Sequence, residues 1–99
     1  MAAYIAAFVE VTEPDTYRTY SNQVLPIVQK YGGRFLARGG GLEILEGDVA
    51  SKRAIILEFP SVARAREFYF SPEYQEILPI RQGNARTDLL AIVEGIAAL

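Results

Sequence analysis

The sequence contains no histidine and no cysteine, which restricts the chemistry that its side chains can perform. Without histidine there is no imidazole general base, no His-ligated haem or transition metal and no Ser-His-Asp triad. Without cysteine there is no thiolate nucleophile, no disulfide and no cysteine-based zinc or iron–sulfur site. Any reaction must therefore use arginine, lysine, tyrosine, carboxylate, serine or backbone groups, or a cofactor that the chain binds.

Arg38 and Glu58 are the residues that we predict to be catalytic. A hairpin that turns at residues 48–52 places Ile44 opposite Ile55, and a bulge at the preceding glycines then brings Arg38 near Glu58. Arg38 would hold an oxyanion, and Glu58 would orient Arg38 or move a proton. The alternative is a structural ion pair at the end of the sheet face, and a one-residue slip at the bulge would reverse that face.

Tyrosines on the predicted helices are the candidate substrate-binding residues. A tyrosine offers an apolar body and one hydroxyl group, a combination that suits pockets for small ligands. The alternative is ordinary packing, because these positions also recur at helical spacing. The four candidates are Tyr17, Tyr20, Tyr69 and Tyr74. We expect no cofactor-binding residues and no metal site, since Glu46 and Asp48 lack the spacing of a calcium loop.

The glycine run in "RGGGLEILEGD" (residues 38–48) could in principle cradle a phosphate. A dinucleotide loop, however, needs its glycines between a strand and a helix, with the phosphates at the helix N-terminus. Here strand-like segments lie on both sides, and no G-K-[ST] follows. We therefore predict a bulge or sharp bend within a long strand.

The predicted elements follow the order β-α-β-β-α-β within a single domain of residues 1–99. This order is typical of a ferredoxin-like α+β sandwich, with a four-stranded antiparallel sheet and helices on one face. Pro26 is expected to kink or divide the first helix. The predicted strands are 3–11, 34–46 interrupted by the glycines, 53–59 and 88–95, and the predicted helices are 15–31, 62–70 and 72–80.

Alternation along the strands predicts which face the helices cover. The covered set is wholly apolar: Ile5, Ala7, Val9, Phe35, Ala37, Ile55, Leu57, Phe59, Leu89, Ala91 and Val93. The opposite face has charged ends and an apolar centre formed by Tyr4, Phe8, Leu36, Ile56, Leu90 and Ile92. Because an exposed apolar patch on a small domain usually marks an interface, we predict a homodimer with sheet facing sheet.

Charge and hydropathy bear on partners and location. Ten basic and twelve acidic residues are mixed along the chain, which argues against a nucleic-acid partner. The segment 53–59 also lacks the stacking aromatics of an RNA-binding domain of the same topology. The apolar start "MAAYIAAFVEV" is too short to span a bilayer and has no positive leader. We expect a cytoplasmic protein that does not contact a membrane.

Five segments together resemble the domain-of-unknown-function 1330 family: "YGGRFLARGG", "LEGD", "EFPS", "FYFSPEYQ" and "IVEG". They occur in the family's order over nearly the whole chain. The matching positions are Arg34, Arg38, Glu58, Ser71, Pro72, Glu73 and Tyr74. The resemblance implies a ferredoxin-like subunit of a dimeric α+β barrel. It implies no settled activity, although fold relatives include cofactor-free monooxygenases and small-ring isomerases.

Two functions remain open from the sequence. The first is a small homodimeric domain that binds an apolar carbonyl-bearing molecule, with cofactor-independent oxygenase or isomerase chemistry. The second is a non-catalytic ligand-binding or regulatory module. Whether the chain is an enzyme is not decided by its residues.

Overall fold

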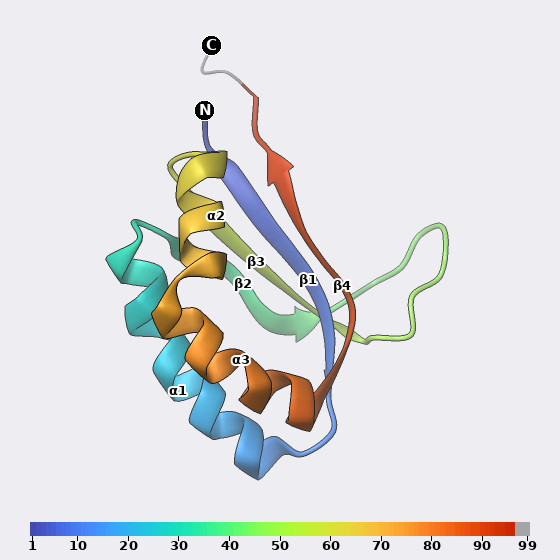
Figure 1. Ribbon diagram of the computed structural model, residues 1–99. Coiled ribbons are helices and arrows are strands. Elements are labelled where there is room, and N and C mark those ends of the chain that lie inside the picture. Colours follow the sequence, from blue (N-terminus) through green and yellow to red (C-terminus); the bar gives the residue numbers. More distant parts are fainter. Residues whose placement is uncertain (97–99) are drawn as a thin grey trace.

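The computed structural model describes residues 1–96, so positions 97–99 of the predicted domain lie outside the described residues. Four strands form one antiparallel sheet in the order β2-β3-β1-β4. All three helices lie on one face of this sheet, as Figure 1 shows. The predicted ferredoxin-like α+β fold is confirmed. The elements are β1 (Ala3–Val11), α1 (Pro14–Lys30), β2 (Arg34–Gly41), β3 (Arg53–Phe59), α2 (Val62–Phe70), α3 (Pro72–Asn84) and β4 (Ala85–Glu94).

Local sequence signals explain where the helices begin and end. The Ser61 side chain accepts a hydrogen bond from the backbone N–H of Arg64 at the start of α2, and Ser71 caps α3 in the same way. Pro14 occupies the first turn of α1, where its missing N–H costs nothing. Of the two outcomes expected at Pro26, a kink or a division, the division does not occur, because α1 is one helix with Pro26 inside it. Helix α3 also extends four residues beyond its predicted end at residue 80.

The glycine run lies inside β2 and produces the predicted bulge. The pairing of β2 with β3 shifts between Arg38 and Gly40, and Gly39 has a φ of 76°. A side chain disfavours this left-handed conformation, so glycine suits the position. The predicted strand over residues 42–46 is wrong, because β2 ends at Gly41 and a long loop follows (Figure 1). The predicted pairing of Ile44 with Ile55 is therefore absent.

The prediction of which side chains of the last strand face the helices is also wrong. Ile92 lies opposite Ile5 and Leu90 lies opposite Ala7, so these two residues face the helices with the core. Leu89 and Val93 lie on the uncovered face instead, each with 51% of its surface exposed. Both sets are apolar, so alternation could not choose between them. The choice is made by hydrogen-bond register with β1.

The uncovered face of the sheet remains apolar after this correction. Across β1, Tyr4 is flanked by Val93 and Phe8 is flanked by Leu89. Leu36 of β2 adds a side chain that is 48% exposed.

Within residues 1–96, no helix is both long enough and apolar enough to cross a bilayer.

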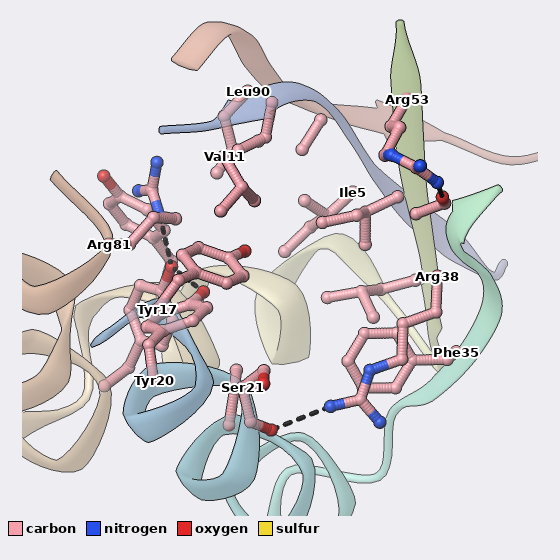
Figure 2. A pocket seen from close by; sticks show the side chains of 18 of the residues that line it. Ile5, Val11, Tyr17, Tyr20, Ser21, Phe35, Arg38, Arg53, Arg81 and Leu90 are labelled. Carbon is pink, nitrogen blue, oxygen red and sulfur yellow. Dashed lines mark hydrogen bonds between the residues drawn. The ribbon is translucent and has the colours of Figure 1, made fainter. Parts of the chain in front are cut away.

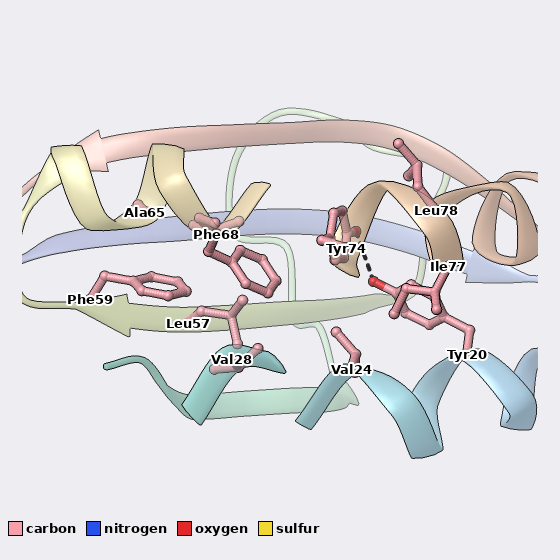
Figure 3. Close-up of a cluster of buried hydrophobic side chains, with 11 residues drawn as sticks. Tyr20, Val24, Val28, Leu57, Phe59, Ala65, Phe68, Tyr74, Ile77 and Leu78 are labelled. Carbon is pink, nitrogen blue, oxygen red and sulfur yellow. Dashed lines mark hydrogen bonds between the residues drawn. The ribbon is translucent and has the colours of Figure 1, made fainter. Parts of the chain in front are cut away.

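The core between helices and sheet is built around aromatic rings that pack against one another at tilted angles (Figure 3). The ring centroid of Phe68 lies 5.2 Å from that of Phe59 and 4.7 Å from that of Tyr74. Gly33, between α1 and β2, packs directly against this cluster. A Cβ at Gly33 would lie only 2.5 Å from Phe59 Cε1. Phe59 is almost completely buried, so its ring has little room to move away.

We expect Gly33→Ala to lower the free energy of unfolding by about 1–3 kcal/mol, because the added methyl group overpacks a ring that cannot move away. Urea denaturation measures the change. Gly40→Ala is the matched control, since a Cβ at that position would have no other atom within 4 Å. That variant should differ from the parent by no more than about 0.5 kcal/mol. Equal stability of the two variants would contradict this account of the core.

Candidate functional site

A cavity of about 300 Å³ lies between the inner face of the sheet and helices α1 and α3. Its floor is aliphatic and comes from the three strands β1, β3 and β4. Aromatic side chains of the helices form its opposite wall (Figure 2). The floor residues are Ile5, Ala7, Val9, Ile55, Leu57 and Leu90. A partly open, largely apolar space of this size suits a small organic ligand.

All four tyrosines predicted from the sequence line this cavity. They come from three helices: Tyr17 and Tyr20 from α1, Tyr69 from α2 and Tyr74 from α3. The Tyr20 and Tyr74 hydroxyls are hydrogen-bonded at 2.9 Å, although 54 positions separate them in sequence. The tyrosines are thus brought together, and their role in ligand binding stays a prediction.

Burial keeps Tyr17 and Tyr20 protonated near neutral pH. Burial raises the pKa of Tyr17 above its ordinary value. Burial also raises the pKa of Tyr20 strongly, and the neighbouring Tyr74 hydroxyl adds to the shift. These hydroxyls can therefore donate and accept hydrogen bonds, but Tyr17 and Tyr20 are poor proton acceptors for catalysis near neutral pH.

Arg38 lies at the edge of the cavity, where it connects β2 to α1. Its guanidinium carbon lies 4.4 Å from the centroid of the Phe35 ring, and its Nη2 donates a hydrogen bond to the Ser21 carbonyl at 2.7 Å. Both contacts are visible at the right of Figure 2. The flat guanidinium is therefore held at the border between the apolar cavity and solvent.

The predicted contact between Arg38 and Glu58 is wrong. Glu58 faces the uncovered side of the sheet and accepts a hydrogen bond from Arg34 Nε at 2.8 Å. The cause is a second bulge that the sequence did not reveal, at Leu36, where the pairing with β3 shifts by one residue. This shift places Arg38 opposite Ile55, on the inner face. Glu58 does not line the cavity.

Arg81 is a cavity residue that was not predicted from the sequence. It is 4% exposed, its Nε donates to the Tyr74 hydroxyl at 3.3 Å, and its Nη1 donates to the Thr87 hydroxyl. The available signal was its place on the apolar stripe of α3 that includes Tyr74, Ile77 and Leu78. An arginine on such a stripe is unusual, because charged side chains are rarely buried.

The charges around the cavity are all positive. Arg38 and Arg53 lie at one end and Arg81 lies at the other (Figure 2). No aspartate or glutamate of the described chain contributes to this lining. Likewise, no group of three or more potential metal-ligating side chains occurs in residues 1–96. The arrangement favours a ligand that carries negative charge or develops it.

A polar contact outside the cavity fixes the start of β3. Asp88, the extra residue at a bulge in β4, accepts hydrogen bonds from the backbone N–H and the hydroxyl of Ser51. It also accepts one from Arg86 Nε at 2.9 Å. Arg86, together with Ser51, lowers the pKa of Asp88 to about 2. Ser51 precedes β3, so this contact helps to hold the strand that carries Arg53.

The chain matches a known protein family over almost its whole length. A family model described as "Domain of unknown function (DUF1330)" matches residues 2–96. The chain belongs to this DUF1330 family. The predicted resemblance is confirmed. Among curated proteins, none matches the sequence.

Solved structures similar to this DUF1330 protein share its fold at low sequence identity. One is a protein of unknown function from Rhodopseudomonas palustris, 24% identical, with 98% of this chain and 84% of that chain covered at a TM-score of 0.68. A second is a dimeric ferredoxin-like protein of unknown function from Jannaschia sp., which is 14% identical. The match covers 96% of this chain and 100% of that chain at a TM-score of 0.67. A third is SnoaB, a cofactor-independent oxygenase from Streptomyces nogalater, which is 12% identical. The match covers 99% of this chain and 95% of that chain at a TM-score of 0.64.

We expect Asp88→Asn to lower the stability of this DUF1330 protein at neutral pH. The folded-state pKa of Asp88, about 2, lies below its ordinary value of 3.8, so the carboxylate contributes stability above pH 3.8. That contribution is lost as the pH falls through 3.8 towards 2. Urea midpoints of the two proteins at pH 7, 4 and 3 should therefore converge on acidification. A constant difference would show that the charge of Asp88 is irrelevant.

Proposed function

We propose that this protein binds a small, largely apolar, carbonyl-bearing molecule in the cavity between sheet and helices. The observation that carries the proposal is the combination of an aliphatic floor, four tyrosines and three arginines without a lining carboxylate in the described chain. The apolar surfaces would bind the body of the ligand. The arginines and hydroxyls would bind its oxygens.

The chemistry that fits this site is cofactor-independent oxygenation or isomerisation of an enolisable substrate. Both reactions pass through an anion on a carbonyl or phenol oxygen, and Arg38 is placed where it could stabilise that anion. The similarity to SnoaB supports an oxygenase only as an analogy of fold. Because no carboxylate lines the described cavity, the substrate must itself be acidic enough to lose its proton to solvent.

A non-catalytic ligand-binding module is the second candidate. It is favoured by one specific observation: the side chain predicted to move a proton, Glu58, lies on the other face of the sheet in contact with Arg34. In that case the cavity would bind and release the same molecule. Oxygen consumption, or conversion of the bound ligand to an isomer, would identify an enzyme, whereas recovery of the unchanged ligand without oxygen uptake would identify a binding module.

We also propose that the uncovered sheet face packs against the same face of a second copy. This face is apolar at its centre, and a similar solved structure is described as a dimeric ferredoxin-like protein. Glu58 and Arg34 would then form a structural ion pair beside the interface. A self-complementary contact of this kind produces a two-fold dimer.

We expect Arg38→Gln to weaken binding of quinone and aromatic lactone probes by roughly tenfold to a hundredfold, because a charge-assisted hydrogen bond is lost. Isothermal titration calorimetry measures the affinities. Arg34→Gln is the matched control, since it changes the same residue type on the same strand but on the opposite face. If both variants bound the probes as tightly as the parent, Arg38 would have only a structural role.

We expect the parent protein to be a dimer at micromolar concentration and Ile56→Glu to be a monomer. Ile56 lies opposite Ala6 at the centre of the uncovered face, and a charge there would be buried without a partner. Size-exclusion chromatography with light scattering measures the mass. Ala63→Glu, on an exposed position of α2, should remain dimeric. A monomeric parent would refute the proposed interface.

A further inference from the structure

Arg81 is the only charged residue that is buried in the described part of the chain. Its nearest hydrogen-bonding partners are neutral: the Tyr74 hydroxyl at Nε and the Thr87 hydroxyl at Nη1. Residues 1–96 provide it with no carboxylate within ion-pair distance. Several exposed arginines, including Arg34 and Arg86, do have such partners at the surface. Arg81, the buried charge, therefore has no anionic partner among the described residues.

A guanidinium held in an apolar environment without a counter-charge is energetically unfavourable. Burying a charge costs several kcal/mol unless it is paired, and hydrogen bonds to neutral hydroxyls offset only part of that cost. Such an arrangement is typical of a functional site, where an unfavourable feature of the free protein is compensated when the ligand binds. Arg81 fits this pattern because it also lines the cavity.

The hydrogen bonds of Arg81 leave part of its guanidinium available. Nε and Nη1 bind the two hydroxyls, whereas no hydrogen bond from Nη2 to a described residue is found. No fully buried side-chain nitrogen or oxygen of the described chain lacks a partner, so Nη2 is not completely enclosed by protein atoms. The remaining N–H groups can bind a carboxylate, whose geometry matches a planar guanidinium.

The position of Arg81 determines which end of a ligand it would bind. Figure 2 shows Arg81 beside Tyr17 and Tyr20, at the opposite end of the cavity from Arg38 and Arg53. Arg38 is exposed, whereas Arg81 is buried, so the Arg81 end is the deep end. An aliphatic floor lies between the two ends.

We propose that Arg81 binds a carboxylate on the ligand, which makes an aromatic carboxylic acid the ligand class of this cavity. The acid would enter with its carboxylate towards Arg81, its rings over the aliphatic floor and any carbonyl or phenol oxygen towards Arg38. This inference rests on the proposed function, since it assumes that the cavity binds a small molecule. It adds the charge and the orientation of that molecule.

The test compares two probes that have the same aromatic body, 2-naphthoate and 2-naphthamide, by isothermal titration calorimetry at pH 7. The parent protein should bind the anion at least roughly tenfold more tightly than the amide, as expected for a charge-assisted hydrogen bond. Arg81→Gln should remove this preference while retaining affinity for the amide. Arg81→Lys, which keeps the charge, should retain part of the preference, and the exposed Arg66→Gln should match the parent.

The outcomes separate the two proposals. If the parent bound both probes equally, the cavity would stand as a binding site and the carboxylate role of Arg81 would be refuted. The same conclusion would follow if Arg81→Gln kept the preference or if the preference disappeared in Arg38→Gln alone. If neither probe nor any quinone or lactone bound the parent, the proposed function would fail as well.

The melting temperature of a variant without the charge distinguishes a structural role of Arg81 from a role in ligand binding. Replacing a buried charge that has no counter-charge by an apolar side chain of similar length is often neutral or stabilising. Arg81→Met should therefore melt, without ligand, at or above the temperature of the parent and should lose the stabilisation by 2-naphthoate. A variant that unfolds, or that melts well below the parent, would identify Arg81 as a structural residue and overturn the inference.

Discussion

The hydrogen bond between the Tyr20 and Tyr74 hydroxyls is the contact on which the site depends. It joins α1 to α3 above the sheet and gives the buried Tyr20 hydroxyl a hydrogen-bond partner in an apolar space. Tyr74 also accepts a hydrogen bond from Arg81, so one contact links both helices to the buried charge. Glu73, which precedes Tyr74 at the start of α3, forms an ion pair with Lys30 at the end of α1. These contacts fix α1 and α3 relative to each other, and the cavity lies between them and the aliphatic floor.

The bulges in the sheet decide which side chains reach that cavity. A regular β2 would place Arg34, Leu36 and Arg38 on one face, because side chains alternate along a strand. The bulge at Leu36 moves Arg38 to the inner face and leaves Arg34 outside with Glu58. A single extra residue therefore separates a surface ion pair from a cavity arginine, and the glycines that follow allow β2 to bend.

The cavity and the uncovered sheet face have different physical characters, which favours different roles. The uncovered face is apolar and open, with Leu36, Leu89 and Val93 about half exposed. The cavity is recessed between sheet and helices, and its polar side-chain groups are hydroxyls and guanidinium groups. A flat apolar face suits a second copy of the chain, whereas a positively charged recess suits a small molecule with an anionic oxygen. The proposed dimer and the proposed ligand therefore do not compete for the same surface.

Much of the fold could be predicted from the sequence, because its signals are local. The order of elements, the caps at Ser61 and Ser71, the glycine bulge and the family are all expressed in neighbouring residues. The tyrosines could be named as candidates for the same reason, since helical spacing places them on apolar stripes. The exclusion of histidine and cysteine chemistry follows from composition alone.

Only the tertiary structure decided which side chains meet. The orientation of β4 depends on register with β1, since both of its faces are apolar, and the bulge at Leu36 has no glycine or proline to indicate it. Arg81 stands out only when its surroundings are known, because a sequence shows an arginine but not the missing carboxylate. Hydrogen-bond register and burial are properties of residues distant in the chain, and a shift of one residue exchanges the two faces of a strand.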